Sequence, residues 1–167
     1  ANPVHYRDSR TEGMMEEAFQ VIPREELYTR TGTQIMRINT LYQLLSLAKK
    51  RPDLLERADS LLLIPDLFHY LLTGEKKAEF TEASTTQMLD PRTGDWDKEL
   101  LERLGIPSRL LPEIIPSGSV YGALKKDLAE ELGVPEVPVI AVASHDTASA
   151  IAAVPAPEKD FLYISCG

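Results

Sequence analysis

The chain has 167 residues, of which 43% are apolar and 26% are charged, a balance that is typical of a folded globular protein and excludes a disordered polymer. Its net charge of −8 opposes binding to nucleic acid or to anionic membranes, because both present negative phosphates. No apolar run approaches the roughly 20 residues that span a bilayer, and the single cysteine, Cys166, cannot form an internal disulfide. We therefore expect a cytoplasmic protein without a nucleic-acid or membrane partner.

Both ends of the chain indicate an internal piece of a longer polypeptide. Residues 2–6 are predicted to form a strand that arrives from earlier sequence. Residues 160–165 are predicted to form a second strand, which runs to Gly167. A strand that runs into glycine usually opens a turn or a phosphate loop. We therefore expect the missing remainder of its own polypeptide to complete the molecule.

The first half of the chain carries mainly helix signals. Amphipathic spacing and favourable first-turn residues predict helices at residues 12–19, from 23 onward, 40–50, 54–58 and 65–72. Asn39 is expected to cap the third of these helices, and Gly74 is expected to close the last one in a left-handed conformation. Residues 60–64, which are apolar from Leu61 onward, fit a buried strand or a short extended segment.

The second half of the chain introduces strands, and this change defines the fold class. The residue pattern predicts an extended segment at 78–81, a helix at 97–104, a strand at 120–123 and a helix at 125–132. Residues 138–144 are rich in β-branched side chains without alternation, which indicates a strand that is buried on both faces. A small apolar helix at 147–154 and the last strand follow. This order of strand, helix and strand predicts an α/β fold.

His145 and Asp146 lie at the carboxyl end of the predicted strand 138–144, where α/β sheets bind their ligands. An aspartate there can act as a general base if it reaches a hydroxyl proton, as happens when a γ-phosphoryl group moves to an alcohol. The alternative is structural, because such residues also cap helices and a histidine here can simply be hydrogen-bonded. From spacing alone, the capping role of Asp146 is favoured.

Two further groups of polar residues suit a sugar or polyol. Tyr6 ends the predicted first strand, and Arg7 and Asp8 follow it. Aromatic, guanidinium and carboxylate groups are those that bind polyols. Gln34 and Asn39 offer amides that can hydrogen-bond a sugar. On composition alone, the simpler explanation is a strand end with solvated charges in the first case and a turn before a helix cap in the second.

Metal and phosphate sites have no signature in this sequence. The three histidines, His5, His69 and His145, are widely separated, and no pair of ligands has the spacing of a metal site. A histidine–aspartate pair also occurs in metal phosphohydrolases, but those need further histidines on helices. The chain also lacks a Walker-type loop and a GxGxxG pattern. We therefore predict no metal ligands within this chain.

Several segments nevertheless match one family in the same order and spacing. They are residues 2–11, 31–32, 64–74, 81–97, 111–122 and 144–150. Together they resemble the FGGY carbohydrate kinases over nearly the whole chain. Residues 2–11 and 141–150 are most similar to the branch of that family that acts on L-rhamnulose, whereas glycerol and xylulose kinases typically have a glycine where this chain has His145.

This resemblance implies an actin-like ATPase domain of the ribonuclease H-like α/β type, helix-rich with a few strands. Residues 1–167 would form part of the N-terminal domain of a kinase and would reach the start of its C-terminal domain at residues 156–167. The parent enzyme would use ATP and Mg²⁺ to phosphorylate a primary hydroxyl of the ketose L-rhamnulose. Gly167 would begin the second phosphate loop, which holds the ATP phosphates.

The resemblance also assigns roles to individual side chains. Asp146 matches the catalytic base of the family, and His145 matches a sugar contact. Tyr6 would line the sugar pocket, with Arg7 or Asp8 hydrogen-bonded to the sugar.

The chain departs from the family in what it lacks. The first phosphate loop and the adenosine-binding domain of the family are absent from this sequence, so we expect no kinase turnover from the chain alone. Two alternatives stay open. One is a kinase for another sugar or polyol, such as fuculose, xylulose or glycerol, and the other is a non-catalytic domain with a kinase-like fold that binds a sugar or a partner.

Overall fold

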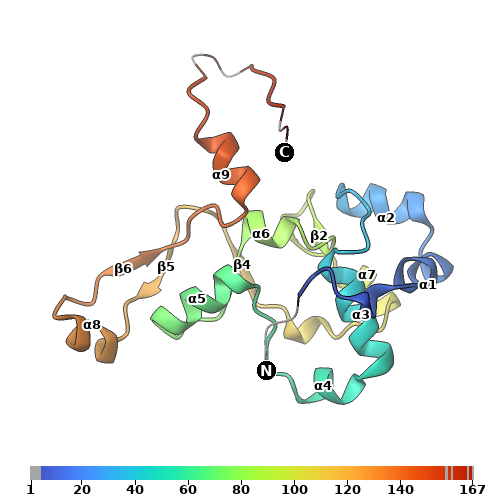
Figure 1. Cartoon of the computed structure of the whole chain (residues 1–167), viewed down its shortest axis with the longest axis horizontal. Helices are drawn as coiled ribbons and strands as arrows, with labels where there is room; N and C mark the ends of the chain where they lie inside the picture. The colour runs from blue at the N-terminus through green and yellow to red at the C-terminus, as the bar shows by residue number, and fades with distance from the viewer. Residues whose placement is uncertain (1–4, 157, 159, 165, 167) are drawn as a thin grey trace.

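The computed structural model describes residues 5–156, 158, 160–164 and 166 (Figure 1). Its helices are α1 (Met14–Val21), α2 (Arg24–Thr31), α3 (Thr40–Lys50), α4 (Pro52–Arg57), α5 (Ile64–Thr73), α6 (Phe80–Ser84), α7 (Lys98–Arg103), α8 (Lys126–Leu132) and α9 (Asp146–Ala152), with 3-10 turns at Ser9–Thr11 and Ser108–Leu110. Its strands are β1 (Lys77–Glu79), β2 (Leu89–Asp90), β3 (Asp95–Trp96), β4 (Glu113–Ile115), β5 (Val120–Ala123) and β6 (Pro138–Ile140). No helix in this part of the chain is long and apolar enough to cross a bilayer.

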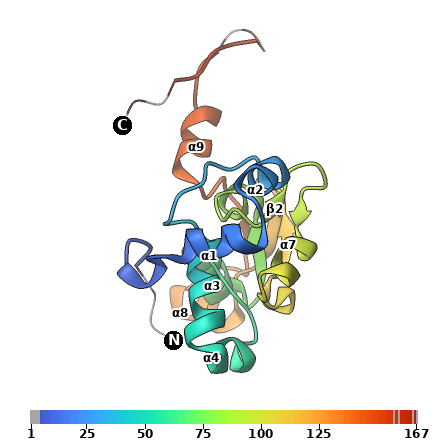
Figure 2. The same ribbon diagram turned by 90° about the vertical axis from the view of Figure 1, so that its right-hand side faces the viewer.

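The main hydrophobic core gathers α1, α2, α3, α4 and α7 on one side of the molecule (Figure 1 and Figure 2). Its centre is α3, where Leu41, Leu44 and Leu45, the apolar face expected from the sequence, are all buried. Leu100 and Leu101 of α7 are fully buried in the same core. Because burying a leucine contributes about 1.5–3 kcal/mol, this core holds α3 firmly in place beside the candidate site.

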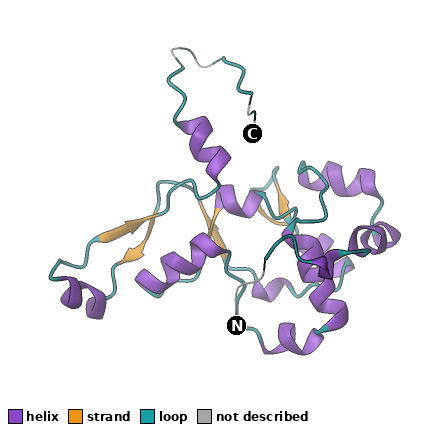
Figure 3. Cartoon of the chain, viewed as in Figure 1, coloured by secondary structure: helices purple, strands orange, loops and turns teal. Residues whose placement is uncertain are grey.

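The strands pair two by two within the described residues. β1 and β4 form a parallel ladder in which Lys77 lies opposite Glu113 and Glu79 lies opposite Ile115. The β2–β3 and β5–β6 pairs are antiparallel. This mixture of many helices with short strands, drawn purple and orange in Figure 3, confirms the predicted helix-rich α/β class. The β1–β4 ladder is the one that matters for the site, because β1 leads directly into α6.

A second, smaller core joins the β5–β6 pair to the rest of the chain. It consists of Ile115, Tyr121 and Ala141. The Tyr121 ring stacks on His69 of α5 with 4.4 Å between the ring centroids, and its hydroxyl oxygen accepts a hydrogen bond from the Lys77 main-chain nitrogen at 3.1 Å. β5 is therefore anchored to α5 and β1, and its ladder with β6 joins the strand before α9 to them.

The left-handed helix end predicted at Gly74 is confirmed, and Gly133 ends α8 in the same way. Gly74 ends α5 with φ 82°, and Gly133 ends α8 with φ 68°. Both values are left-handed, a conformation that glycine adopts without the steric cost of a Cβ atom. The start of α3 differs from its prediction, because Asn39 occupies the N-cap position but its side chain makes no capping hydrogen bond.

The predicted strands at the two ends of the chain are wrong where the structure describes them. Residues 5–8 contain a turn rather than the end of a strand, and residues 160–164 belong to no strand. Residues 2–4 of the first prediction and Ser165 of the second lie outside the described residues.

The strand predicted at residues 138–144 is shorter and more exposed than expected. β6 ends at Ile140, and Val142 is 61% exposed. Among the described residues β6 pairs only with β5, on one edge and in antiparallel orientation. An apolar run shows the tendency of a segment to be buried, but the packing partners decide how much of it is covered. In both views α9 projects from the body, and it buries none of its own residues (Figure 1 and Figure 2).

Candidate active site

A large cavity lies between the helical body and the segment that begins α9. Its volume is about 1000 Å³, at the upper end of the range of small-molecule sites. Residues 61–64 supply much of its apolar wall. The polar side chains that line it belong to Tyr6, Arg10, Asn39, Thr40, Gln43, Ser60, Glu82, Thr85, Ser144, His145 and Asp146. The fold thus brings Tyr6, Asn39, His145 and Asp146, all of them predicted site residues, to one cavity.

Asp146 presents an accessible carboxylate to this cavity. It is the first residue of α9, and its side chain is 96% exposed. One oxygen, Oδ1, accepts hydrogen bonds from the main-chain nitrogen and the hydroxyl of Thr147, at 2.6 Å and 3.3 Å. The N-cap position belongs to His145, so Asp146 does not cap α9. Although Oδ1 bonds one amide of the first turn of α9, that of Thr147, the side chain is exposed, so the carboxylate is accessible to a hydroxyl group in the cavity.

His145 is fixed through its main chain, while its ring stays beside the carboxylate of Asp146. The main-chain nitrogen of His145 donates a hydrogen bond to the hydroxyl of Thr81 at 3.2 Å. The ring Nε2 lies 3.6 Å from Oδ1 of Asp146, and the side chain makes no capping bond to α9. The imidazole can therefore hydrogen-bond a ligand that reaches Asp146.

The N-terminal group of predicted sugar contacts is divided by the structure. Tyr6 lines the cavity, whereas Arg7 and Asp8 do not. The guanidinium of Arg7 lies over the Tyr6 ring, 5.3 Å from its centroid. Asp8 caps the 3-10 turn at Ser9–Thr11, and hydrogen bonds from the main chain and then the side chain of Arg10 lower the pKa of its carboxyl group. Arg10 itself lines the cavity, a placement that the sequence pattern did not indicate.

The amides of the second predicted group are partly used inside the protein. Asn39 is buried, and its Nδ2 donates to the carbonyl oxygen of Gln34 and to Oε1 of Gln87, both at 2.9 Å. These two bonds fix the orientation of the amide, whose Oδ1 makes no capping bond to α3. The exposed side chain of Gln34 does not line the cavity. Gly167, the predicted phosphate-loop residue, lies outside the described residues.

Glu82 is a site candidate that sequence reasoning missed. It lies in α6, is half-buried, and lines the cavity together with His145 and Asp146. Burial raises the pKa of its carboxyl group, opposed by His145 and reinforced by Glu79 and Asp146. No signal in the sequence links it to Asp146, because only the folding of α6 against residues 144–146 brings the two carboxylates to one cavity.

Next to the site lies Asp66, a buried carboxyl group whose pKa is raised. Its Oδ1 accepts a hydrogen bond from the Glu79 main-chain nitrogen at 3.0 Å, while Oδ2 is buried and has no partner among the described residues. Burial raises the pKa of Asp66 from an ordinary value of 3.8 to about 7. Between about pH 4 and pH 7 the folded state therefore keeps a proton that the unfolded state releases, so the free energy of unfolding falls as pH rises through this range.

Asp66→Asn is expected to stabilise the protein at pH 8 by about 2 kcal/mol and to have little effect at pH 4. An amide cannot ionise, which removes the cost of ionising a buried carboxyl group, about 1.4 kcal/mol for each pH unit by which the pKa is raised. The unpaired N–H of the amide offsets part of this gain. Denaturant unfolding at several pH values measures this difference. Asp127→Asn, an exposed aspartate in the first turn of α8, is the control. If the stabilities of wild type and Asp66→Asn keep the same pH slope, Asp66 does not titrate as described.

The lining of the cavity favours an uncharged ligand. The described residues hold no group of three or more histidine, cysteine, aspartate or glutamate side chains that could bind a metal ion. The cavity is lined by one arginine, Arg10, and by no lysine. What the cavity offers is apolar surface, hydroxyls, amides, two carboxylates and an imidazole, which suits an uncharged polyol better than a phosphate.

Comparison with known proteins identifies the family of the chain. Residues 1–152 match the FGGY family of carbohydrate kinases, N-terminal domain. The chain therefore belongs to this family of sugar kinases.

Two curated relatives are rhamnulokinases. The chain is 50% identical over 164 residues to the rhamnulokinase of Oceanobacillus iheyensis, covering 98% of this chain and 34% of the relative. It is 46% identical over 165 residues to the rhamnulokinase of Halalkalibacterium halodurans, covering 98% of this chain and 35% of the relative. It thus spans about a third of the length of the curated relatives that it matches.

Solved structures of sugar kinases have the same fold. A ligand-bound xylulose kinase from Lactobacillus acidophilus superposes with a TM-score of 0.80 at 26% identity, covering 90% of this chain and 31% of that protein. A carbohydrate kinase from Novosphingobium aromaticivorans superposes with a TM-score of 0.75 at 27% identity, covering 90% of this chain and 32% of that protein.

Proposed function

We propose that this chain is part of an ATP-dependent kinase that converts L-rhamnulose to L-rhamnulose 1-phosphate. The observation that carries the proposal is the single cavity shared by Tyr6, Asn39, His145 and Asp146, which come from three distant parts of the chain. The choice of sugar rests on the relatives named rhamnulokinase, which are 46–50% identical to this chain. Residues 1–167 would then be part of the N-terminal domain, with the second domain beginning near residues 156–167.

In the proposed reaction Asp146 is the general base. The primary hydroxyl oxygen of the ketose forms a bond to the γ-phosphorus of ATP, the bond from that phosphorus to ADP breaks, and the hydroxyl proton passes to the Asp146 carboxylate. His145 and Glu82 would orient the sugar by hydrogen bonds to its other hydroxyls, and the Tyr6 ring would cover an apolar face of the sugar. ATP and its Mg²⁺ would be held mainly by parts of the longer polypeptide.

An ATP-coupled assay on the full-length protein tests this function. With L-rhamnulose, L-fuculose, D-xylulose and glycerol compared, kcat/KM is expected to be highest for L-rhamnulose by at least about tenfold, since a missing or misplaced hydroxyl leaves buried polar groups unpaired. The chain of 167 residues assayed alone is expected to show no turnover, because it spans only about a third of its relatives and the family resemblance places the groups that position ATP mainly in the remainder. Turnover by the chain alone, or a different preferred substrate, would contradict the proposal. Sugar binding without turnover in the full-length protein would indicate a non-catalytic domain.

A further inference from the structure

A buried carboxylate lies directly beneath the segment that carries Asp146. Glu79, the last residue of β1, is fully buried. Its Oε1 accepts hydrogen bonds from the main-chain nitrogen of Thr81 at 3.0 Å and from the hydroxyl of Ser117. Its Oε2 accepts from the hydroxyl of Thr81 at 2.5 Å and from the main-chain nitrogens of Glu82 and Ser144, both at 3.1 Å. Donors thus converge on one side chain from α6, from the loop after β4 and from the segment that carries Asp146 (residues 144–146, called the base segment).

Thr81 extends this network to the residue next to Asp146. Its hydroxyl donates to Glu79 and accepts a hydrogen bond from the main-chain nitrogen of His145 at 3.2 Å. The backbone on the N-terminal side of Asp146 is therefore held at two consecutive amides, those of Ser144 and His145, by residues more than 60 positions earlier in the chain.

Apolar packing holds the chain as far as Ala141, which is buried in the smaller core, but does little beyond it. Val142 is largely exposed, and no residue of α9 is buried. The polar bonds to Glu79 and Thr81 are therefore the main contacts that fix the start of α9 on the cavity side. Burial by itself would raise the pKa of Glu79, but the hydrogen bonds from Ser117, Thr81 and Ser144 outweigh it and lower the pKa. An ionised carboxylate has only acceptor sites, which match the donors that surround it.

We propose that Glu79, acting through Thr81, is a positioning residue that sets the place of Asp146 in the cavity. This inference rests on the proposed kinase function. Glu79 is buried away from the cavity, so its role is to orient the base segment rather than to touch the sugar. A displacement of about 1 Å at a reacting group can cost on the order of 10²-fold in rate, which makes such an anchor consequential.

The test uses two variants that remove one donor each from the same carboxylate. Glu79 also caps α6, so replacing it would mix loss of position with loss of folding. Thr81→Val removes the hydroxyl that joins Glu79 to His145, whereas Ser117→Ala removes a donor that does not lead to Asp146. In the full-length protein, Thr81→Val is expected to lower kcat by about 10-fold or more with less than about 3-fold change in the sugar KM. Ser117→Ala is expected to stay within about 2-fold, and Thr81→Ser, which restores the hydroxyl, is expected to recover kcat.

Hydrogen exchange of the backbone amides separates this inference from the proposed function. The amide of His145 is expected to exchange at least about tenfold faster in Thr81→Val and at the wild-type rate in Ser117→Ala, whether or not the protein phosphorylates a sugar. If the wild-type protein has no kinase activity, the proposed function fails while the exchange result still decides the positioning role. Equal losses in both variants, in proportion to their thermal stabilities, would show a purely structural role and overturn the proposal.

Discussion

Asp146→Asn in the full-length protein is expected to lower kcat for L-rhamnulose phosphorylation by about 10²–10⁴-fold, the range that general-base catalysis contributes. Asparagine has the same shape and keeps an oxygen that accepts the hydrogen bonds from Thr147, so the start of α9 is preserved. It cannot take a proton from the sugar hydroxyl. The sugar KM is therefore expected to change little, because only the transition state loses an interaction. Steady-state kinetics with saturating ATP, together with sugar binding by calorimetry, measure the two effects separately.

A matched control for this change exists elsewhere in the chain. Asp127 lies in the first turn of α8, is exposed, and accepts a hydrogen bond from the main-chain nitrogen of the next residue, Leu128, at 3.0 Å. Asp127→Asn therefore reproduces the loss of charge at a helix start without touching the cavity. It is expected to leave kcat unchanged. An Asp146→Asn variant with wild-type kcat would remove Asp146 from the role of base and leave it with a local bond to Thr147 only.

The elements that the sequence predicted well are those with local signals at both ends. α5 has Pro65 in its first turn and Gly74 after its last turn, and both signals act within a few residues of the helix. α3 carries an apolar stripe with helical spacing, and that stripe is buried. His145 and Asp146 were also local predictions, because a junction between a strand and a helix can be recognised from neighbouring residues.

The remaining features depend on contacts between distant segments, which the spacing of apolar residues along the chain does not predict. Residues 138–144 have the composition of a fully buried strand, but the single ladder with β5 leaves one edge of β6 unpaired among the described residues. Glu79 and Glu82 were not recognised, because their relation to residues 144–146 exists only after α6 has packed under that segment. Asp8 was expected at the sugar, but it is held by the main-chain nitrogen of Arg10.

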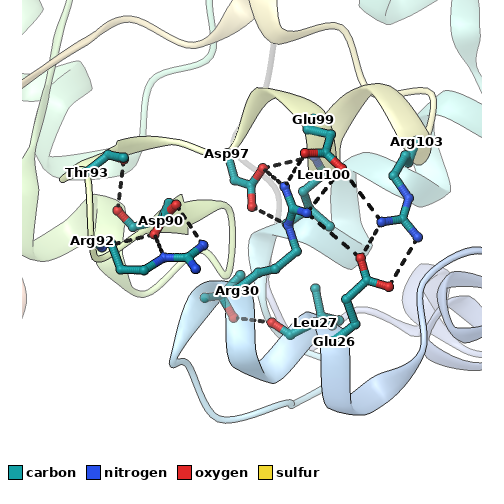
Figure 4. A network of polar contacts seen from close by, with 11 residues as sticks. Glu26, Leu27, Arg30, Asp90, Arg92, Thr93, Asp97, Glu99, Leu100 and Arg103 are labelled. Atoms are coloured by element: carbon teal, nitrogen blue, oxygen red, sulfur yellow. Dashed lines mark hydrogen bonds and ion pairs between the residues drawn. The ribbon is translucent and has the colours of Figure 1, made fainter.

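The core that supports the site is tied together by an ion pair between α2 and the start of α7, in which the Asp97 carboxylate is buried and Arg30 is partly buried (Figure 4). Arg30 donates from Nε to Oδ2 of Asp97 and from Nη2 to Oδ1, both at 2.7 Å, and it also contacts Glu99. Asp97 in turn caps α7 by accepting from the main-chain nitrogen of Leu100 at 3.0 Å. Burial alone would raise the pKa of Asp97, but the hydrogen bonds from Arg30 and Leu100 outweigh it and lower the pKa. The buried carboxylate is thus ionised and depends on its arginine.

Arg30→Met is expected to lower the free energy of unfolding by about 3 kcal/mol, because it leaves the charge of Asp97 buried without its partner. Methionine keeps much of the apolar stem, so lost packing contributes little. The control is Arg92→Met, which breaks a pair of similar geometry with Asp90, at 2.9 Å and 3.0 Å. The two arginines differ in environment, since the side chain of Arg30 is 19% exposed and that of Arg92 is 66% exposed. Water screens the second pair, and its loss is expected to cost less than about 1 kcal/mol.

The pH dependence of the Arg30→Met effect identifies its cause. The lowered pKa of Asp97 means that its stabilisation is present above the pKa of the unfolded chain and is lost as pH falls through the folded value. The difference between wild type and Arg30→Met, measured by urea unfolding, is therefore expected to be full at pH 7 and to shrink below about pH 4. Combining Arg30→Met with Asp97→Asn is expected to recover part of the loss, since the uncompensated charge is then gone. Equal and small losses for Arg30→Met and Arg92→Met would show that the buried pair contributes no more than an exposed one.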